Sequence, residues 1–298
     1  MKKKITLKER VNKARHPYEI TFNIISYVLS IIVYVGLGYA LIVASNTDTI
    51  LNKLANFTGL RSKVFELIIR IGGPTVFIIL ALLLGKLLFV NMTFVGESSS
   101  SNPRLSQTKF KEVNDIYSKL VKELGLNRVP EVYVCSKDVD PEYLGLTICS
   151  EMAISIHSKL IQNAYKHNDF SIVEYTLARK LARIYLVHYN PINLVMTFPI
   201  KAIPYYRDAW ERIECYSADR FAADMVGVEN AVRIIYEDSF DTDLFDENKD
   251  IMKIVKELIK SEHKYEKDGR WFYNLESNEP LPVYRLSALI EDKPGRVF

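Results

Sequence analysis

Apolar residues run without a charged residue from position 20 to position 44, in the stretch ITFNIISYVLSIIVYVGLGYALIVA. This stretch is longer than the roughly 20 residues that a helix needs to cross the hydrocarbon core of a bilayer. A second apolar stretch extends from about 64 to 90, and its charge-free centre covers 71–85. That centre crosses a bilayer only if Arg70 and Lys86 extend toward opposite interfaces, and a buried or interfacial helix is the alternative. The pattern predicts a transmembrane hairpin over residues 20–90.

Basic residues gather ahead of the first apolar stretch, within residues 1–19, at Lys2, Lys3, Lys4, Lys8, Arg10, Lys13 and Arg15. Because cytoplasmic loops carry an excess of Lys and Arg, we expect this basic tail in the cytoplasm, and two spans bring the rest of the chain back to the same side. The tail and the apolar core are both too long for a cleavable signal peptide. The sequence therefore predicts a multi-pass protein of the cell membrane with a soluble domain that faces the cytoplasm.

A polar, serine-rich stretch, GESSSSNPRLSQ at 96–107, follows the hairpin. This composition is typical of a linker, so we interpret 91–107 as a linker and 108–298 as a folded domain. Helical periodicity begins at 109–126, and short apolar runs at 130–136 and 152–161 predict two strands. The later predicted helices cover 170–189, 204–227, 228–240 and the charged, amphipathic segment 250–268. This order predicts an α+β domain that is mostly α.

The stretch YNPINLVMTFPIKAIPYY, residues 189–206, connects two of the predicted long helices. Pro191 is expected to end the first of them, since proline has no N–H for the helical hydrogen-bond pattern. Aromatic and aliphatic side chains dominate the rest of the stretch. The pattern fits a loop that contacts the membrane and fits core packing equally well.

Composition and charge narrow the class of protein. The apolar share of 48% reflects the two long apolar stretches, and the net charge of +3 is concentrated in the basic tail. This distribution indicates a membrane-surface segment and gives no sign of a nucleic-acid-binding face. The cysteines Cys135, Cys149 and Cys215 are odd in number and form no C-x-x-C motif, which is typical of a reducing compartment.

The helix over 170–189 contains the segment Ala178-Arg179-Lys180-Leu181-Ala182-Arg183, with His188 five residues later. This segment resembles the zinc-binding helix of the HtpX and CAAX-prenyl-protease type of membrane metallopeptidases. In that family the helix carries A-H-E-L-G-H, followed five residues later by another His. The resemblance places Arg179 and Arg183 at the positions of the two His ligands and Lys180 at the position of the catalytic Glu.

Two further segments resemble motifs of the same family. The R-x-x-E-x-x-A-D-x-x-A motif, whose Glu is the third zinc ligand, corresponds here to Arg212, Cys215, Ala218, Asp219 and Ala222. The C-terminal H-P motif followed by R-I-x-x-L corresponds to Glu279, Pro280, Arg285, Leu286 and Leu289. The resemblance covers about residues 105 to 290. It implies a zincin-like, metallopeptidase-like domain in the cytoplasm, preceded by two transmembrane helices.

The residues at the metal positions cannot perform the family's chemistry. Zinc requires neutral imidazole nitrogens, carboxylates or thiolates, with one position left for water. Arginine only donates hydrogen bonds, so Arg179 and Arg183 cannot bind zinc. A protonated Lys180 has no lone pair with which to accept a proton from a metal-bound water. Zinc is therefore expected in the family but not in this chain, and a relocated site built from His157, Cys215 and an acid is the alternative.

Two guanidinium groups inside an apolar helix require partners, because an unpaired buried cation is costly. We expect Arg179 or Arg183 to pair with an acid on the facing helix. Asp219 is the first candidate, followed by Glu211, Glu214 and, on the same helix, Glu174. The alternative is that both side chains reach solvent. The expected structural polar cluster consists of Arg179, Arg183, Asp219, Arg212 and His188.

These observations predict a membrane-anchored pseudopeptidase that has lost its zinc ligands and catalytic Glu, uses no cofactor and acts by protein binding or regulation. One alternative is an active membrane zinc metalloendopeptidase with a rearranged site. Another is a structural membrane-anchored protein without a peptide groove. The expected partners are the lipid bilayer and another membrane or cytoplasmic protein, and no nucleic acid.

Overall fold

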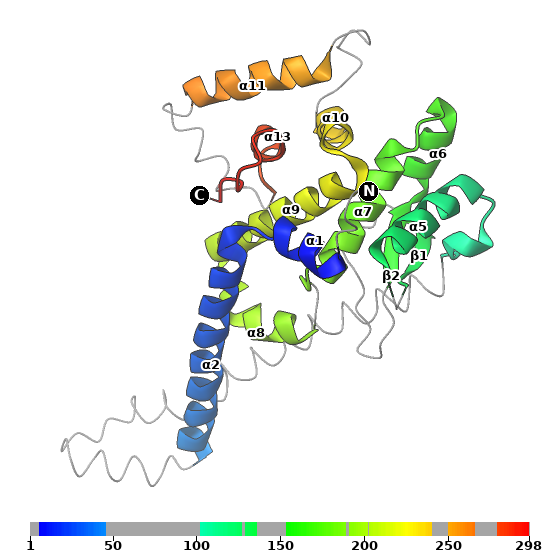
Figure 1. Ribbon diagram of the computed structural model, residues 1–298. Helices are drawn as coiled ribbons and strands as arrows, with labels where there is room; N and C mark the ends of the chain where they lie inside the picture. The colour runs from blue at the N-terminus through cyan, green and yellow to red at the C-terminus, as the bar shows by residue number, and fades with distance from the viewer. Residues whose placement is uncertain are drawn as a thin grey trace, which may run out of the picture.

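The computed structural model describes residues 6–45, 102–126, 129–135, 153–188, 191–201, 203–239, 250–265 and 279–297. The fold is α+β and mostly helical, as predicted, with one small two-stranded sheet (Figure 1). The elements of the N-terminal half are α1 (Leu7–Ala14), α2 (Pro17–Ser45), α5 (Lys111–Leu124), β1 (Glu131–Cys135), β2 (Ala153–His157) and α6 (Ser158–His167). They are followed by α7 (Ser171–Tyr185), α8 (Pro191–Lys201), α9 (Pro204–Val226), α10 (Val228–Ser239), α11 (Ile251–Tyr265) and α13 (Pro282–Ile290).

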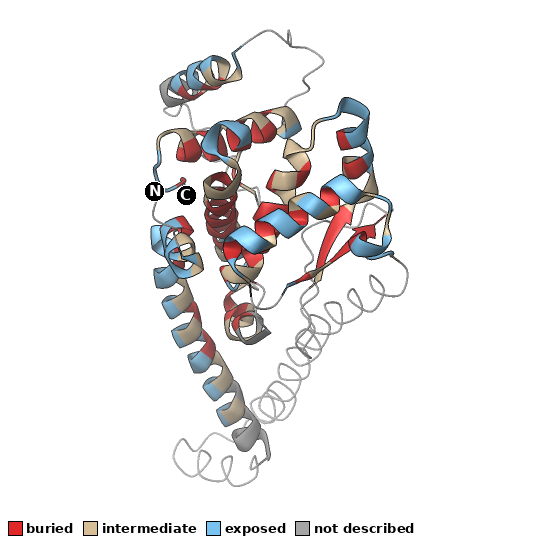
Figure 2. Cartoon of the chain, turned by 45° about the vertical axis from the view of Figure 1, so that its right-hand side comes forward, coloured by how far each residue is buried: buried red, intermediate tan, exposed pale blue. Residues whose placement is uncertain are grey.

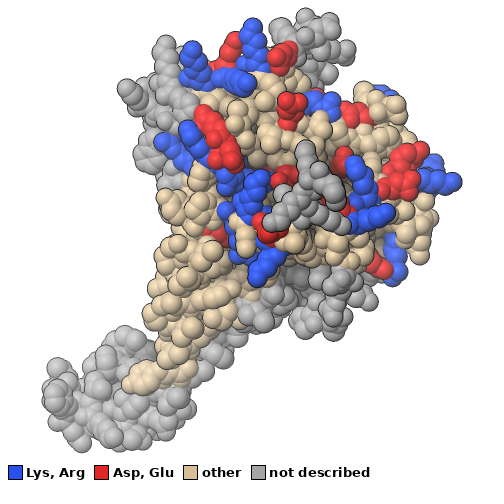
Figure 3. Space-filling model, viewed as in Figure 1, with Lys and Arg blue, Asp and Glu red and all other residues tan. Residues whose placement is uncertain are grey.

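Helix α2 extends away from the body of the protein (Figure 1). Its segment Pro17–Gly36 is long and apolar enough to cross a membrane, and within the described ranges it is the one helix that is. Its apolar side chains face outward, with Ile32 60% and Val35 66% exposed. In Figure 3 the part of this helix that extends from the body forms a column without charged side chains, whereas Lys, Arg, Asp and Glu gather on the body. The predicted second span lies outside the described residues.

The described part of the basic segment before α2, which was predicted to be a tail, packs against the folded body. Thr6 and Glu9 form a capping box that starts α1. Leu7, Val11 and Ala14 follow at helical spacing and pack into the main core. Arg10 lies 3.1 Å from Asp224 and 3.2 Å from Glu123. The predicted boundary between residues 1–19 and the domain therefore does not separate two independently packed units.

The two strands pair in parallel, with Glu131 opposite Ala153 and Cys135 opposite His157. The predicted second strand is too long, because α6 begins at Ser158. The Nδ1 atom of His157 accepts a hydrogen bond of 3.1 Å from the backbone N–H of Lys159, so His157 caps this helix. Ile161 and Ala164 then follow at helical spacing and are buried, which explains the helix in place of a strand.

Helices α7 and α9 pack against each other at the centre of the body, and α10 and α13 cover them. Figure 2 shows that buried positions gather on the central helices and the strands, while α2 is mostly exposed or intermediate. Helix α7 ends at Tyr185, earlier than predicted, and Val187 adopts a positive φ of 69°. Pro191, which was expected to end this helix, instead begins α8, since the first helical position needs no N–H partner.

Candidate functional site

The carboxylate of Asp219, on α9, is the centre of a buried polar network. Its Oδ2 accepts a hydrogen bond of 2.7 Å from Nε of Arg285, and its Oδ1 one of 3.0 Å from Nη2 of the same residue. Nε of Arg179 lies 3.0 Å from Oδ1, and the hydroxyl of Tyr175 donates to Oδ1 at 2.8 Å. Asp219 itself is only 1% exposed. The ion pair predicted between α7 and α9 is thus confirmed for Arg179.

Three helices deliver these side chains. Tyr175 and Arg179 are four residues apart and therefore share one face of α7. Arg285 comes from α13, which starts two residues after the buried Pro280. Glu279 lies 3.4 Å from Nη2 of Arg179 and 3.8 Å from Nη1 of Arg285. The positive charges of Arg179 and Arg285 are thus balanced by the negative charges of Asp219 and Glu279.

The charge state of Asp219 follows from this arrangement. Burial alone would raise the pKa of its carboxyl group, because the charged form is poorly solvated in the interior. Arg285 and Arg179 outweigh burial and lower the pKa of Asp219 to about 2. The carboxylate therefore stays ionised at neutral pH. It holds Arg285 through two charge-assisted hydrogen bonds, which are stronger than bonds between neutral groups, and Arg179 through an ion pair.

Cys215 lies one helical turn before Asp219 and touches the same network. Its Sγ accepts a hydrogen bond of 3.1 Å from Nη2 of Arg179 and lies 3.7 Å from Oδ2 of Asp219. Burial first, and the Asp219 carboxylate second, raise the pKa of the Cys215 thiol to about 11. Zinc binds the thiolate and not the thiol. Together with the donor-only guanidinium of Arg179, this site does not fit zinc.

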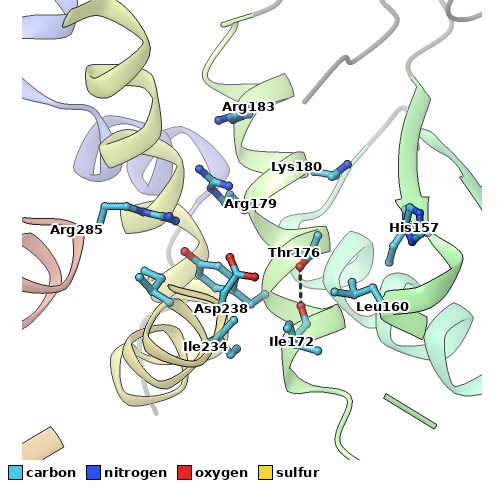
Figure 4. Close-up of a pocket in the computed structure, with 13 residues that line it drawn as sticks. His157, Leu160, Ile172, Thr176, Arg179, Lys180, Arg183, Ile234, Asp238 and Arg285 are labelled. Atoms are coloured by element: carbon cyan, nitrogen blue, oxygen red, sulfur yellow. Dashed lines mark hydrogen bonds between the residues drawn. The ribbon is translucent and has the colours of Figure 1, made fainter. Parts of the chain in front are cut away.

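Lys180 and Arg183 lie on different sides of α7: Lys180 points toward β2, whereas Arg183 lies one turn beyond Arg179 (Figure 4). Nζ of Lys180 donates a hydrogen bond of 2.6 Å to the backbone carbonyl of Ser155, so it connects α7 to β2. Arg183 is buried one turn after Arg179, but it is not among the described contacts of Asp219. The arginine that pairs with Asp219 besides Arg179 is Arg285, which comes from a distant part of the chain.

The other predicted partners and cluster members lie elsewhere. Glu174 pairs with Lys119 at 3.1 Å, Glu211 lies 4.0 Å from Arg207, and Glu214 accepts from Trp210. Nε of Arg212 donates to the carbonyl of Val297 at 2.9 Å, and Nε2 of His188 lies 3.4 Å from Glu19. Arg212 and His188 therefore contact the C-terminal segment and the start of α2, outside the Asp219 network.

Sequence reasoning missed Tyr175 as a member of the network, although its position four residues before Arg179 was a signal. It also missed Glu19, which is buried where α2 joins the body. Oε2 of Glu19 accepts a hydrogen bond of 2.7 Å from the hydroxyl of Ser217. No pattern in the local sequence indicates that an acid at the start of an apolar helix contacts a serine about 200 positions later.

A pocket of about 200 Å³ opens beside the network, between β2, α6, α7 and α10. Figure 4 shows its basic side, where Arg179, Lys180 and Arg183 follow one another along α7 and Arg285 approaches from α13. The rest of the lining is mainly aliphatic and includes Ile156, Leu160, Ile172, Ile234 and Ile235, with Asp238 at one side. The volume is below that of a typical drug-sized ligand site and suits a single side chain.

The described residues do not assemble the alternative zinc site. No group of three or more His, Cys, Asp or Glu side chains in that part of the chain is placed to hold a metal ion. His157 caps α6 at the end of β2, whereas Cys215 contacts Arg179. His157, Cys215 and an acid as third ligand therefore do not come together among these residues.

No family model matches the chain, and neither a curated protein nor a solved structure matches it. Any similarity to the HtpX type of metallopeptidase therefore depends on the motifs quoted above and on the contacts that their residues make. Those contacts are the basis of the proposal that follows.

We expect Cys215 to resist alkylation in the folded protein. A pKa of about 11 leaves about one thiolate per thousand thiols at pH 8, and burial blocks access to that fraction. The measurement is mass spectrometry after iodoacetamide treatment of a Cys135→Ser, Cys149→Ser chain, before and after denaturation. The denatured chain is the control for full reactivity. Modification of Cys215 at equal rates in both states would contradict the described environment.

Proposed function

We propose that this protein is a membrane-anchored pseudopeptidase, similar in scaffold to the HtpX type of metallopeptidase, that binds another protein without hydrolysing it. The observation that carries the proposal is that residues from three separate motif segments meet in one network. Arg179 comes from the first segment, Cys215 and Asp219 from the second, and Glu279 and Arg285 from the third. Their convergence is what a scaffold shared with that family would produce.

The chemistry of the network supports a binding function over hydrolysis. The guanidinium of Arg179 contacts Cys215 and Asp219, where the family's zinc would supply positive charge. Lys180, at the position of the catalytic Glu, donates to the Ser155 carbonyl. A group that only donates protons in hydrogen bonds cannot act as the general base for a water molecule. This favours the pseudopeptidase over the alternative of an active, rearranged zinc peptidase.

Membrane anchoring is supported by the exposed apolar surface of α2, which would be unfavourable in water. Helix α1, which carries Lys8, Arg10 and Lys13, packs on the body. The basic segment and the body must therefore lie on the same side of the membrane. By the positive-inside rule, that side is the cytoplasm. We retain the multi-pass topology within this proposal, with the second span over about 64–90.

The pocket beside α7 supports binding over a solely structural role. It combines an aliphatic lining with the basic residues Arg179, Lys180 and Arg183. This combination suits an apolar side chain of a bound protein segment that also carries acidic residues. Binding sites are concave and mostly apolar, with a few polar groups that set orientation.

The proposal is tested by restoring the family's zinc ligands. The variant combines Arg179→His, Lys180→Glu, Arg183→His and Cys215→Glu in the full chain, purified in detergent. We expect this variant to bind about one zinc per chain and the wild-type chain to bind none, measured by elemental analysis after dialysis. The matched control omits Cys215→Glu and should bind zinc at least tenfold more weakly, because one ligand is missing.

A wild-type chain that holds stoichiometric zinc and shows chelator-sensitive proteolysis would favour the active peptidase. If the variant with the four substitutions folds but binds no zinc, the proposed similarity to the metallopeptidase scaffold is wrong. Binding is tested separately with a fluorescent, reduced and carboxymethylated protein. We expect the wild-type chain to bind it without cleavage and Leu160→Asp to weaken binding at least tenfold, while Gln162→Asp, on the exposed side of α6, leaves it unchanged.

A further inference from the structure

Helix α8 lies beside the apolar helix α2, below the level of the body (Figure 1). The hydroxyl of Tyr27 on α2 donates a hydrogen bond of 2.8 Å to the side-chain oxygen of Asn193 on α8. The hydroxyl of Tyr34, two turns further along α2, donates one of 2.7 Å to the backbone carbonyl of Val195. These contacts fix the height of α8 along α2.

That height can be measured from Glu19, which contacts Ser217 and therefore marks the level of the body. An α-helix rises about 1.5 Å per residue, so Tyr27 lies about 12 Å and Tyr34 about 22 Å beyond Glu19 along the helix axis. The hydrocarbon core of a bilayer is about 30 Å thick. If α2 crosses the membrane, Val195 therefore lies near the bilayer midplane.

The hydrogen bond from Tyr34 has a specific physical cause in α8. Pro199 lies inside this helix and has no N–H, so the carbonyl of the residue four positions earlier, Val195, loses its helical partner. The Tyr34 hydroxyl supplies the missing donor at 2.7 Å. In hydrocarbon there is no water to do so, and a proline is tolerated there only where a neighbouring helix satisfies the freed group.

The other polar groups of α8 are also satisfied within the protein. The hydroxyl of Thr197 donates to the carbonyl of Asn193 at 2.7 Å, and the side-chain amide of Asn193 donates to the carbonyl of Val187 at 3.4 Å. Nζ of Lys201, at the end nearest α9, lies 3.6 Å from Glu214 and 5.2 Å from the ring centre of Trp210. The one charged residue of α8 thus turns back toward the body.

Residues before and after α8 both contact the end of α2 that adjoins the body. His188, before α8, contacts Glu19, and Tyr206, after it, hydrogen-bonds to the carbonyl of Phe22 at 3.4 Å. Both contacts lie near the body end of α2. An 11-residue helix is only about 16 Å long, so α8 cannot cross a bilayer. Tyr205, which precedes Tyr206 in the chain, is 71% exposed, and an exposed aromatic side chain is typical of a segment that meets lipid headgroups.

From these contacts we propose that α8 is a re-entrant membrane element: Pro191–Lys201 dips into the cytoplasmic leaflet, and Met196 and Phe198 contact lipid acyl chains. The inference rests on the proposed membrane anchor α2 and adds a second lipid contact that links α7 directly to α9. Two of the three helices that form the Asp219 network, α7 and α9, are thereby joined through the bilayer. The position of the body relative to the membrane is then fixed by two elements instead of one.

The test measures depth in the membrane directly. A nitroxide amino acid is incorporated genetically, one site at a time, so that the native cysteines stay in place, and the full chain is reconstituted into phosphatidylcholine and phosphatidylglycerol vesicles. The sites are Met196 and Phe198 on α8, Val35 on α2 and Gln162 on α6. Collision rates with oxygen, which concentrates in the bilayer, and with a nickel chelate, which stays in water, are then compared.

We expect the ratio of oxygen to nickel collisions at Met196 and Phe198 to approach that of Val35 and to exceed that of Gln162 at least tenfold. A water-like ratio at Val35 would show that the anchor, and with it the proposed membrane protein, is wrong. A lipid-like ratio at Val35 with a water-like ratio at Met196 and Phe198 would overturn the re-entrant element alone. Low collision rates of both probes at these two sites would place α8 inside protein and would also overturn it.

A second variant tests the hydrogen bond that holds α8 at this depth. Tyr34→Phe removes the donor for the Val195 carbonyl but keeps the ring, and Tyr39→Phe, on an exposed position of the same helix, is the matched control. We expect Tyr34→Phe to increase nickel collisions at Met196 several-fold, because the freed carbonyl draws α8 toward water. Equal collision rates in the two variants would contradict the proposed role of this bond.

Discussion

Replacing Arg285 with Ala is expected to lower the free energy of unfolding by about 3–5 kcal/mol. Two of the hydrogen bonds to the Asp219 carboxylate come from Arg285, at 2.7 and 3.0 Å, and that carboxylate is fully buried. Without Arg285, the described partners that remain are Arg179, Tyr175 and the weakly donating thiol of Cys215. Most of the loss therefore arises from the uncompensated charge of Asp219 and not from the bonds themselves.

A double-mutant cycle separates this cause from simple loss of packing. Asp219→Ala added to Arg285→Ala should recover part of the loss, because the stranded charge is gone. Arg220→Ala is the matched control, since Arg220 follows Asp219 on α9 but pairs at 3.2 Å with Asp292, whose side chain is 88% exposed. An exposed pair contributes at most about 1 kcal/mol. The measurement is denaturant unfolding of the full chain in detergent, and strictly additive losses would refute the coupling.

The sequence was sufficient to predict most of the helices and the class of fold. Helix α5 ends at Leu124 as predicted, because Gly125 adopts the left-handed conformation that closes helices. Helix α9 was also predicted within about one residue, since Gly227 follows it. Predictions of this kind succeed because the periodic pattern and the end signal are both local.

Other elements depended on contacts that local patterns do not contain. The short helix α8 was overlooked, because Pro191 and Pro199 were interpreted as residues that interrupt a helix. The hydrogen bond from Tyr34 of α2 replaces the one that Pro199 cannot donate. The sequence of α1 was interpreted as a charged tail, although three of its residues pack into the core. In both cases a distant part of the chain supplies the stabilising partner.

In the candidate site, too, some contacts could be predicted from the sequence and others could not. The pairing of Arg179 with Asp219 could be predicted, because both sit on long helices in adjacent segments and a buried guanidinium needs an acid. The pairing with Arg285 could not be predicted as a contact, since 66 residues separate it from Asp219. Sequence alone also suggested Arg183 as an equal candidate. On α7 it lies one turn after Arg179, and periodicity alone does not distinguish which of the two pairs with Asp219.

Removing residues 1–95 is expected to abolish cooperative unfolding of the remaining chain. Residues of α1 fill part of the main core, and burial of an aliphatic side chain contributes about 1.5–3 kcal/mol. The truncation also removes Glu19, which accepts from the buried hydroxyl of Ser217, and His16, whose backbone N–H donates to the same hydroxyl at 2.9 Å. The summed loss is comparable with the whole stability of a domain, about 5–15 kcal/mol.

The comparison of the truncated chain with the full-length chain must exclude the simpler explanation that exposed membrane surface causes aggregation. Both chains are therefore unfolded thermally in the same detergent, which covers the apolar side of α8 equally in each. A full-length chain with Lys2, Lys3 and Lys4 replaced by Ser is the matched control, because it loses basic charge without losing α1, and it should unfold like the wild type. A peptide of residues 6–24, added to the truncated chain, should restore a cooperative transition. If the truncated chain unfolds cooperatively near the wild-type temperature, the serine-rich segment does mark an independent domain and α1 contributes little to its core.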